Sequence, residues 1–250
     1  MQKVFGRPEG LTELPFHYCP GCTHGIIHRL IGEVLEELNI IDKTIGVVPV
    51  GCAGFSQNYF SCDCVGSAHG RAQAVATGVK RSLPDRLVFT YQGDGDIASI
   101  GTAHAIHVAA RGEKITSIMV NNAVFGMTGG QMAPTTLEGQ VTSTSPYGRD
   151  CSLVGPPMDL PKTMTTFERA VYVAAGSVDS PKNIRLTKQY LKKAFQVQQQ
   201  GLGFSFVSIL STCPTNWGLS PVDSLQWLRD HMMPIYQLGE LKMTEEVAAL

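Results

Sequence analysis

Charged residues are scarce in this 250-residue chain: only 16% are Asp, Glu, Lys or Arg, and the formal net charge at pH 7 is −1. A protein that binds nucleic acid or an anionic membrane through charge needs a basic surface, and this balance gives no basis for one. Apolar runs long enough to span a bilayer are missing as well, so we expect no transmembrane helix. The 43% of hydrophobic residues suffice for a sizeable buried core.

The first ten residues, Met1 to Gly10, carry charges and lack the apolar stretch of a secretory signal peptide. We therefore expect a cytoplasmic protein, in which thiols stay reduced and disulfides are rare. The chain nevertheless contains seven cysteines. In a reducing compartment, that number indicates metal chemistry more than crosslinking.

Two polar motifs follow two apolar segments in the middle of the chain. Residues 87–92 and 115–120 have the continuous apolar character of buried parallel strands, and residues 97–110 between them predict a crossover helix. Asp94 then falls at the carboxyl end of the first strand and Asn122 at the end of the second. Open α/β sheets bind ligands at that edge. Oxygen ligands there suit a hard cation such as Mg²⁺, with a diphosphate completing its coordination.

The remaining pattern predicts one α/β domain over residues 1–250, with a doubly wound, mostly parallel sheet, an N-terminal arm and a C-terminal extension. The segment 125–161 is long and rich in Gly, Pro, Ser and Thr, which is typical of a functional or interfacial loop. The arm is expected at 1–15, and further strands are expected at 45–50, 171–175 and 204–210. Helices are expected from Cys22 to Leu38 and at 69–81, 182–200 and 221–229. The chain is then expected to finish in a frayed end.

Cys19 and Cys22 form a CxxC motif, which by itself fits a zinc half-site, a redox disulfide or an iron–sulfur half-site. Cys52 and Cys213 also lie beside glycine or proline in short motifs. Together the four cysteines would supply the four thiolates that a cubane [4Fe–4S] cluster needs.

Gly93-Asp94-Gly95 with Asn121-Asn122 resembles the thiamine diphosphate motif of thiamine-dependent enzymes. With the four cysteines in this order around it, the chain is similar to the β subunit of 2-oxoacid:ferredoxin oxidoreductases over roughly residues 15–220. Further matches are His69-Gly70-Arg71-Ala72, Gly126-Met127-Thr128-Gly129-Gly130-Gln131, Thr144-Ser145-Pro146-Tyr147-Gly148 and Gly203-Phe204-Ser205-Phe206. The resemblance implies a thiamine diphosphate-binding fold and oxidative decarboxylation of a 2-oxoacid with coenzyme A, giving acyl-CoA, CO₂ and reduced ferredoxin.

The resemblance also implies roles for individual residues. Asp94, Asn122 and the backbone carbonyl of Val124 are the implied Mg²⁺ ligands. His69 is the implied catalytic residue near the thiamine, and we expect Asp96 to use its backbone amide because its carboxylate would repel a diphosphate. The implied cofactor-binding residues are Val50, Gly51, Cys52, Ala53, His69, Gly95, Asp96, Gly126 and Met127.

Cys19, Cys22, Cys52 and Cys213 are the implied cluster ligands by the same resemblance. The other cysteines, Cys62, Cys64 and Cys151, are expected to be ordinary thiols in or near loops. A structural zinc site is the alternative, either on the four implied ligands or on Cys19, Cys22, Cys62 and Cys64. In that case the chain would be a zinc-stabilised scaffold or regulatory subunit with a degenerate cofactor site.

The implied enzyme has partner chains: an α subunit, γ and ferredoxin-like δ subunits, and ferredoxin as acceptor. In this family the glutamate that activates the thiamine ring comes from a partner. No acid here has a matching motif, since Glu33, Glu36 and Glu37 fall on the outer side of a helix pattern and Glu113 falls in a turn. The sequence leaves the 2-oxoacid open among 2-oxoglutarate, branched-chain acids, pyruvate and aryl pyruvates, although the Cys19-to-His24 stretch and the short C-terminus suit the first two better.

Overall fold

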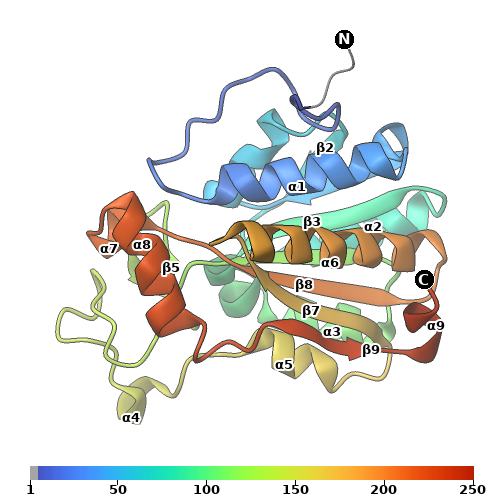
Figure 1. Ribbon diagram of the computed structural model, residues 1–250. Coiled ribbons are helices and arrows are strands. Elements are labelled where there is room, and N and C mark those ends of the chain that lie inside the picture. The colour runs from blue at the N-terminus through green and yellow to red at the C-terminus, as the bar shows by residue number, and fades with distance from the viewer. Residues whose placement is uncertain (1–4) are drawn as a thin grey trace.

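The computed structural model describes residues 5–250, so the first four residues of the expected arm and of the segment judged not to be a signal peptide lie outside it. Within the described chain, seven strands form one sheet in the order β2-β1-β3-β4-β8-β7-β9 (Figure 1). The strands are β1 (Thr44–Val48), β2 (Asp63–Gly66), β3 (Leu87–Gly93), β4 (Thr116–Asn121), β7 (Ala170–Ser177), β8 (Phe204–Leu210) and β9 (Gly239–Met243). All pairs are parallel except β7 with β9, so the predicted doubly wound, mostly parallel fold is confirmed.

Helices cover both faces of the sheet (Figure 1). On one face lie α1 (His24–Glu37) and α6 (Pro181–Gln199); on the other lie α2 (Ala72–Ser82), α3 (Thr102–Arg111) and α5 (Leu160–Thr165). Every residue of β4, β7 and β8 is buried because the strands are covered on both sides. None of the helices in the described part of the chain is long and apolar enough to cross a membrane.

The shorter elements gather mainly at the carboxyl ends of the parallel strands. They are the 3₁₀ segments Ile41–Lys43 and Cys52–Asn58, the hairpin of β5 (Val124–Phe125) and β6 (Gln131–Met132), α4 (Cys151–Val154), α7 (Pro214–Trp217), α8 (Pro221–Trp227) with the π-helical turn Leu228–Met232, and α9 (Glu245–Ala248). Figure 1 shows α4, α7, α8 and β5 together at that end. The long segment predicted at 125–161 is thus mostly irregular and lies beside the strand ends.

Two predicted helices differ from their patterns. The predicted crossover at 97–110 is present, but it is divided at Gly101, where a π-helical turn over Asp96–Ile100 precedes α3. The backbone of Gly70 packs against this division, since a Cβ on Gly70 would lie 2.7 Å from the Gly101 backbone nitrogen. The helix predicted from His69 begins only at α2, and His69 lies in the turn before it.

The C-terminal prediction is wrong in one respect. The predicted helix at 221–229 is present as α8 and the π-helical turn after it, but it is not the last helix, because β9 and α9 follow. Val247 in α9 is fully buried, while the final residues 248–250 are exposed. The strand β9 is short and mostly half-exposed, so its sequence lacks the apolar run that identifies the central strands. Its pairing with β7 comes from tertiary contact.

Candidate active site

A cavity of about 120 Å³ opens at the carboxyl ends of β1, β3 and β4. It lies where ligands bind in open α/β sheets, at the edge that the sequence predicted. Its lining consists of His24, Val50, Gly51, Cys52, Ala53, His69, Gly93, Asp94, Gly95, Asp96, Asn122, Val124, Phe125, Gly126, Met127 and Thr128. The structure therefore brings together every predicted magnesium, cofactor-binding and catalytic residue; of the predicted cluster ligands, Cys52 is in the lining.

Asp94 is almost completely buried in this cavity, with 1% of its surface exposed. Burial raises the pKa of its carboxyl group to about 6, although hydrogen bonds from the Thr135 hydroxyl and from the backbone amides of Gly95 and Ala123 act against the rise. A buried carboxylate without a cationic partner is costly. A bound cation would remove that cost, so the environment of Asp94 fits a metal ligand.

The turn after β4 presents the other two predicted ligands. Ala123 has a left-handed backbone, with φ at 59°, and its amide donates to the Asn121 side chain over 3.1 Å. The amide of Val124 donates to Asn122 Oδ1 over 3.2 Å, and Trp217 Nε1 donates to the Asn122 carbonyl over 3.2 Å. These bonds hold Asn122 and Val124 at the cavity beside Asp94. Carboxylate, amide and carbonyl oxygens form the donor set that Mg²⁺ prefers.

Gly95 allows the second strand end to approach the first. A Cβ added at Gly95 would lie 2.5 Å from the Phe125 ring, so a side chain there would displace the ring from the cavity wall. The backbone amide of Gly95 also donates to Asp94. Close packing against Phe125 therefore explains why a glycine is needed at position 95, where the sequence predicted cofactor contact.

Asp96 points its carboxylate away from the cavity centre and into a set of donors. It accepts hydrogen bonds from the Gly70 backbone amide over 2.7 Å, from the Gln92 side chain, and from His69 through Nδ1. With the carboxylate held by these three groups, contact of the Asp96 backbone amide with a ligand stays a prediction. An Nδ1–H that donates to a carboxylate fixes the imidazole tautomer and leaves Nε2 as the free ring nitrogen of His69.

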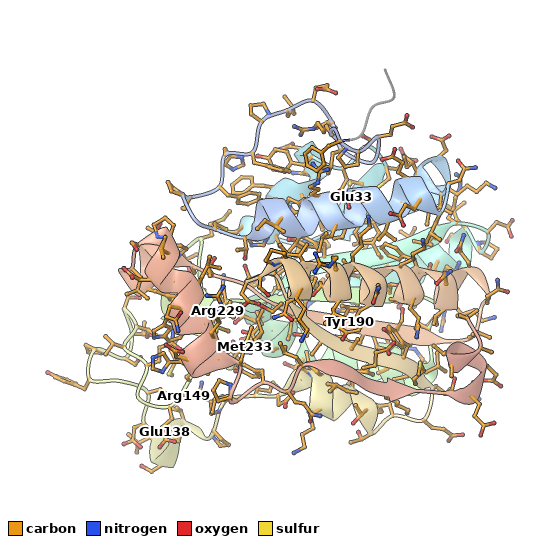
Figure 2. The ribbon with its side chains drawn as sticks, in the orientation of Figure 1. Glu33, Glu138, Arg149, Tyr190, Arg229 and Met233 are labelled. Atoms are coloured by element: carbon orange, nitrogen blue, oxygen red, sulfur yellow. The ribbon has the colours of Figure 1, made fainter. Side chains whose placement is uncertain are left out.

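Arg149 organises the long segment around Asp94, although no motif pointed to it. The guanidinium is buried and donates to the backbone carbonyls of Ala133, Pro134, Thr136, Gly155 and Pro156 over 3.0 to 3.2 Å. Figure 2 shows Arg149 at the same end of the molecule as Arg229, which lies in the π-helical turn after α8. The carbonyls belong mainly to the turn around Thr135, whose hydroxyl binds Asp94.

The four predicted cluster cysteines form one group beside the cavity. Each thiol lies within electrostatic reach of the other three. Burial, and to a lesser degree the neighbouring thiols, raise the pKa of Cys22 to about 12 and that of Cys52 to about 11. Burial also raises the pKa of Cys213, while Cys19 is exposed. No three His, Cys, Asp or Glu side chains in residues 5–250 are arranged to hold a single metal ion.

The remaining cysteines need a correction. Cys62 is buried in the bend before the edge strand β2, so it lies in a loop as expected, whereas Cys64 lies within that strand. The Cys64 thiol donates to the Cys62 backbone carbonyl over 3.7 Å, and the neighbouring Cys62 thiol lowers the pKa of Cys64. They are absent from the group formed by Cys19 and Cys22. Cys151 begins the short helix α4, where it is half-buried.

Several side chains at the site were missed by the sequence patterns. His24, expected to be a general helix residue, is buried, lines the cavity and binds the Tyr91 hydroxyl through Nδ1 over 2.6 Å. Its burial lowers its pKa to about 4, so the ring is neutral at pH 7. The others are Thr135, Arg149, Asn216 and Trp217. His24 follows the CxxC motif by two residues, which was the one local signal available.

Residues 49–209 match the family described as thiamine pyrophosphate enzyme, C-terminal TPP binding domain. The ketoisovalerate oxidoreductase subunit VorA of Methanothermobacter thermautotrophicus is 45% identical over 93% of this chain and 49% of its own length. The 2-oxoglutarate synthase subunit KorB of Archaeoglobus fulgidus is 37% identical over 87% of this chain and 77% of its own. The chain therefore spans about half the length of VorA and about three quarters of that KorB.

A solved structure of 2-oxoglutarate:ferredoxin oxidoreductase from Magnetococcus marinus, with 2-oxoglutarate, coenzyme A and succinyl-CoA bound, has a similar fold. The TM-score is 0.77 at 31% identity, and the match covers 89% of this chain and 72% of that chain.

Proposed function

This chain belongs to the family of thiamine pyrophosphate-binding subunits of 2-oxoacid:ferredoxin oxidoreductases, and from that premise we propose that it is the β subunit of such an enzyme. The reaction converts a 2-oxoacid and coenzyme A into acyl-CoA, CO₂ and a proton. Its two electrons pass singly through a [4Fe–4S] cluster to two molecules of ferredoxin. The observation that carries the proposal is the position of Cys52, which lines the cavity and also belongs to the four-thiol group.

Asp94, Asn122 and the Val124 carbonyl would hold Mg²⁺ and, through it, the diphosphate of thiamine diphosphate. The thiamine ring, when bound, supplies the electron sink that decarboxylation needs. Within this chain, His69 is held by Asp96 through Nδ1, so its Nε2 is left to accept a hydrogen bond or a proton from a ligand in the cavity. Asp96 itself is occupied by its donors.

The four-thiol group supports a cluster better than a zinc ion. A cubane is bound through its outer corners, so its thiolates stand further apart than the four ligands of one tetrahedral ion. The four thiols here lie close enough to influence one another, yet no three suit a single ion among the described residues. This favours the enzyme over the zinc-stabilised scaffold.

The cavity favours a branched-chain 2-oxoacid over 2-oxoglutarate. Val50, Val124, Phe125 and Met127 give it apolar walls, and no Lys or Arg stands among the described residues that line it. A second substrate carboxylate would need a cationic partner, because burying it unpaired is costly. An aliphatic side chain instead gains from contact with such walls.

Among residues 5–250, no glutamate lines the cavity, where it could activate the thiamine ring. Glu33 and Glu37 are paired with Lys188 on the outer side of α1, and Glu113 is paired with Arg81 and Arg111. Figure 2 shows Glu33 on α1, away from the strand ends. We therefore propose that an α subunit completes the site, with γ and ferredoxin-like δ subunits in a cytoplasmic complex.

Anaerobic purification of the complex tests the proposal directly. We expect a brown protein with about four irons per β chain, thiamine diphosphate-dependent reduction of a viologen, and higher kcat/KM for 2-oxoisovalerate than for 2-oxoglutarate. A colourless protein with one zinc and no turnover would contradict the enzyme assignment. Higher kcat/KM for 2-oxoglutarate would contradict only the substrate preference.

A further inference from the structure

The short helix α7 lies between the two groups of ligands. It begins directly after Cys213 and follows β8, and Figure 1 shows it at the carboxyl end of the sheet near β5. Its last two residues each contact a different group of ligands: Asn216 contacts Cys213, and Trp217 contacts the carbonyl of Asn122. One helical turn thus touches both a predicted cluster ligand and a predicted magnesium ligand.

The amide of Asn216 bridges two acceptors. Its Nδ2 lies 3.1 Å from the Cys213 sulfur and 2.8 Å from the Gly126 carbonyl oxygen. The two amide hydrogens can serve the two acceptors together. A Cβ on Gly130 would lie 2.9 Å from the Cβ of Asn216, so the glycine in the β5–β6 hairpin leaves the room that this side chain occupies.

Gly126 lies beside residues of both sites. A Cβ built on it would lie 3.5 Å from the Cys213 sulfur, 3.7 Å from the Cys52 sulfur and 3.5 Å from Nδ2 of Asn122. The backbone of Gly126 therefore packs against two thiols and a magnesium ligand at once. The carbonyl that Asn216 holds belongs to this residue.

We propose that Asn216 is a positioning residue that raises the reduction potential of the cluster by donating to Cys213 and that fixes the Gly126 backbone between the cluster and the thiamine diphosphate site. The inference rests on the proposed function, because it requires the cluster. In the step concerned, the [4Fe–4S]²⁺ cluster takes up one electron and becomes [4Fe–4S]⁺, with no bond broken in the protein. An N–H donor stabilises the more negative reduced form more strongly, and hydrogen bonds to the sulfurs are a known determinant of potential.

Asn216→Leu and Asn216→Asp test the role in the purified anaerobic complex. The leucine has a similar size and no donor, while the aspartate keeps the shape but places a negative charge beside the thiol. We expect full iron content, a lower midpoint potential in an EPR-monitored redox titration, and a larger fall for aspartate than for leucine. Thiamine diphosphate affinity by calorimetry should weaken by about tenfold because the Gly126 carbonyl loses its donor.

Two variants of the same helix serve as controls. Thr215→Ala changes an exposed side chain and should alter neither the potential nor the affinity. Trp217→Phe removes the donor to Asn122 and should weaken thiamine diphosphate binding while the potential stays that of the parent. An equal fall in potential in Trp217→Phe would show a general disturbance of α7 and overturn the specific role of Asn216.

A parent potential in both Asn216 variants at full iron content would overturn the proposal. Iron loss in both, with iron retained in Thr215→Ala, would overturn it too, since Asn216 would then support cluster assembly and not its potential. The parent complex separates these results from the proposed function: if it contains no iron, the enzyme assignment fails, whatever the variants do.

Discussion

Asp94→Asn should stabilise the metal-free protein and abolish its response to magnesium and thiamine diphosphate. The carboxyl group is 1% exposed, and burial raises its pKa from 3.8 to about 6. Its surroundings offer hydrogen-bond donors but no cation in the metal-free state. An asparagine of the same shape carries no charge, and the Thr135 hydroxyl can rotate to accept a bond from its amide.

The magnitude follows from the pKa shift. A rise from 3.8 to about 6 corresponds to about 3 kcal/mol at roughly 1.36 kcal/mol per pKa unit. Well below pH 4 the Asp94 carboxyl is protonated in both the folded and the unfolded state, so it does not change the free energy of unfolding. Between pH 4 and 6 the unfolded chain loses this proton first, so the free energy of unfolding falls as the pH rises. Above pH 6 the full penalty is present, and the substitution should recover up to about 3 kcal/mol.

Bound magnesium should make the parent protein more stable than the Asp94→Asn variant. The cation stabilises the Asp94 carboxylate, so the parent gains stability in proportion to the logarithm of ligand concentration over Kd. The asparagine variant binds weakly and should gain little. Stability therefore favours the variant with a chelator and the parent with saturating Mg²⁺ and thiamine diphosphate.

Denaturant unfolding of the complex at several pH values between 5 and 8, with and without the ligands, measures both effects. Asp179→Asn is the matched control. Asp179 is also buried, but hydrogen bonds from Arg229, Asn183 and Ser177 outweigh burial and lower its pKa, so its loss should destabilise the protein with or without ligands. A metal-free Asp94→Asn protein that is less stable than the parent at pH 8, or one that still binds thiamine diphosphate normally, would refute the reasoning.

Three further outcomes are expected. Cys213→Ser should lose the cluster iron and the EPR signal, whereas Cys64→Ser should keep both; the reverse pattern would mean that the fourth ligand was misassigned. Thr135→Val keeps the side-chain shape but removes the hydrogen bond to Asp94, so calorimetry should report about tenfold weaker Mg²⁺-dependent binding of thiamine diphosphate, against no change for Thr215→Val, which is exposed and outside the cavity lining. The β chain alone should neither exchange the thiazolium hydrogen quickly nor decarboxylate a 2-oxoacid until the α partner is added, and turnover by a partner-free chain would contradict the divided site.

The central fold was predictable because its signals are local. The apolar segments that became β3, β4 and β8 are continuous in sequence and are buried on both faces as such segments require. The polar motif after each of the first two strands then had to lie at one edge of the sheet. By contrast, β2 and β9 are short edge strands with exposed or half-exposed residues, so no period distinguished them from loops.

The supporting residues of the site were not predictable because their partners are distant in sequence. Thr135 binds Asp94 from 41 positions away, and Asn216 binds Gly126 from 90 positions away. Arg149 has six hydrogen bonds to backbone carbonyls, and backbone acceptors leave no pattern in a sequence. These side chains determine how accurately the ligands are held, yet each looks locally like an ordinary loop residue.

The order of the strands in the sheet explains why the two predicted cofactor sites lie next to each other. The strands β1, β3, β4 and β8 are consecutive neighbours in the sheet. Cys52 follows β1 and Cys213 follows β8, while Asp94 and Asn122 follow the two strands between them. The thiols therefore flank the magnesium ligands along one edge, although β8 lies far from β4 in the chain. Under the proposed function, electron transfer between the sites would need no motion of the sheet. The segments that contact both sites, Gly126 and α7, are where substitutions should affect both.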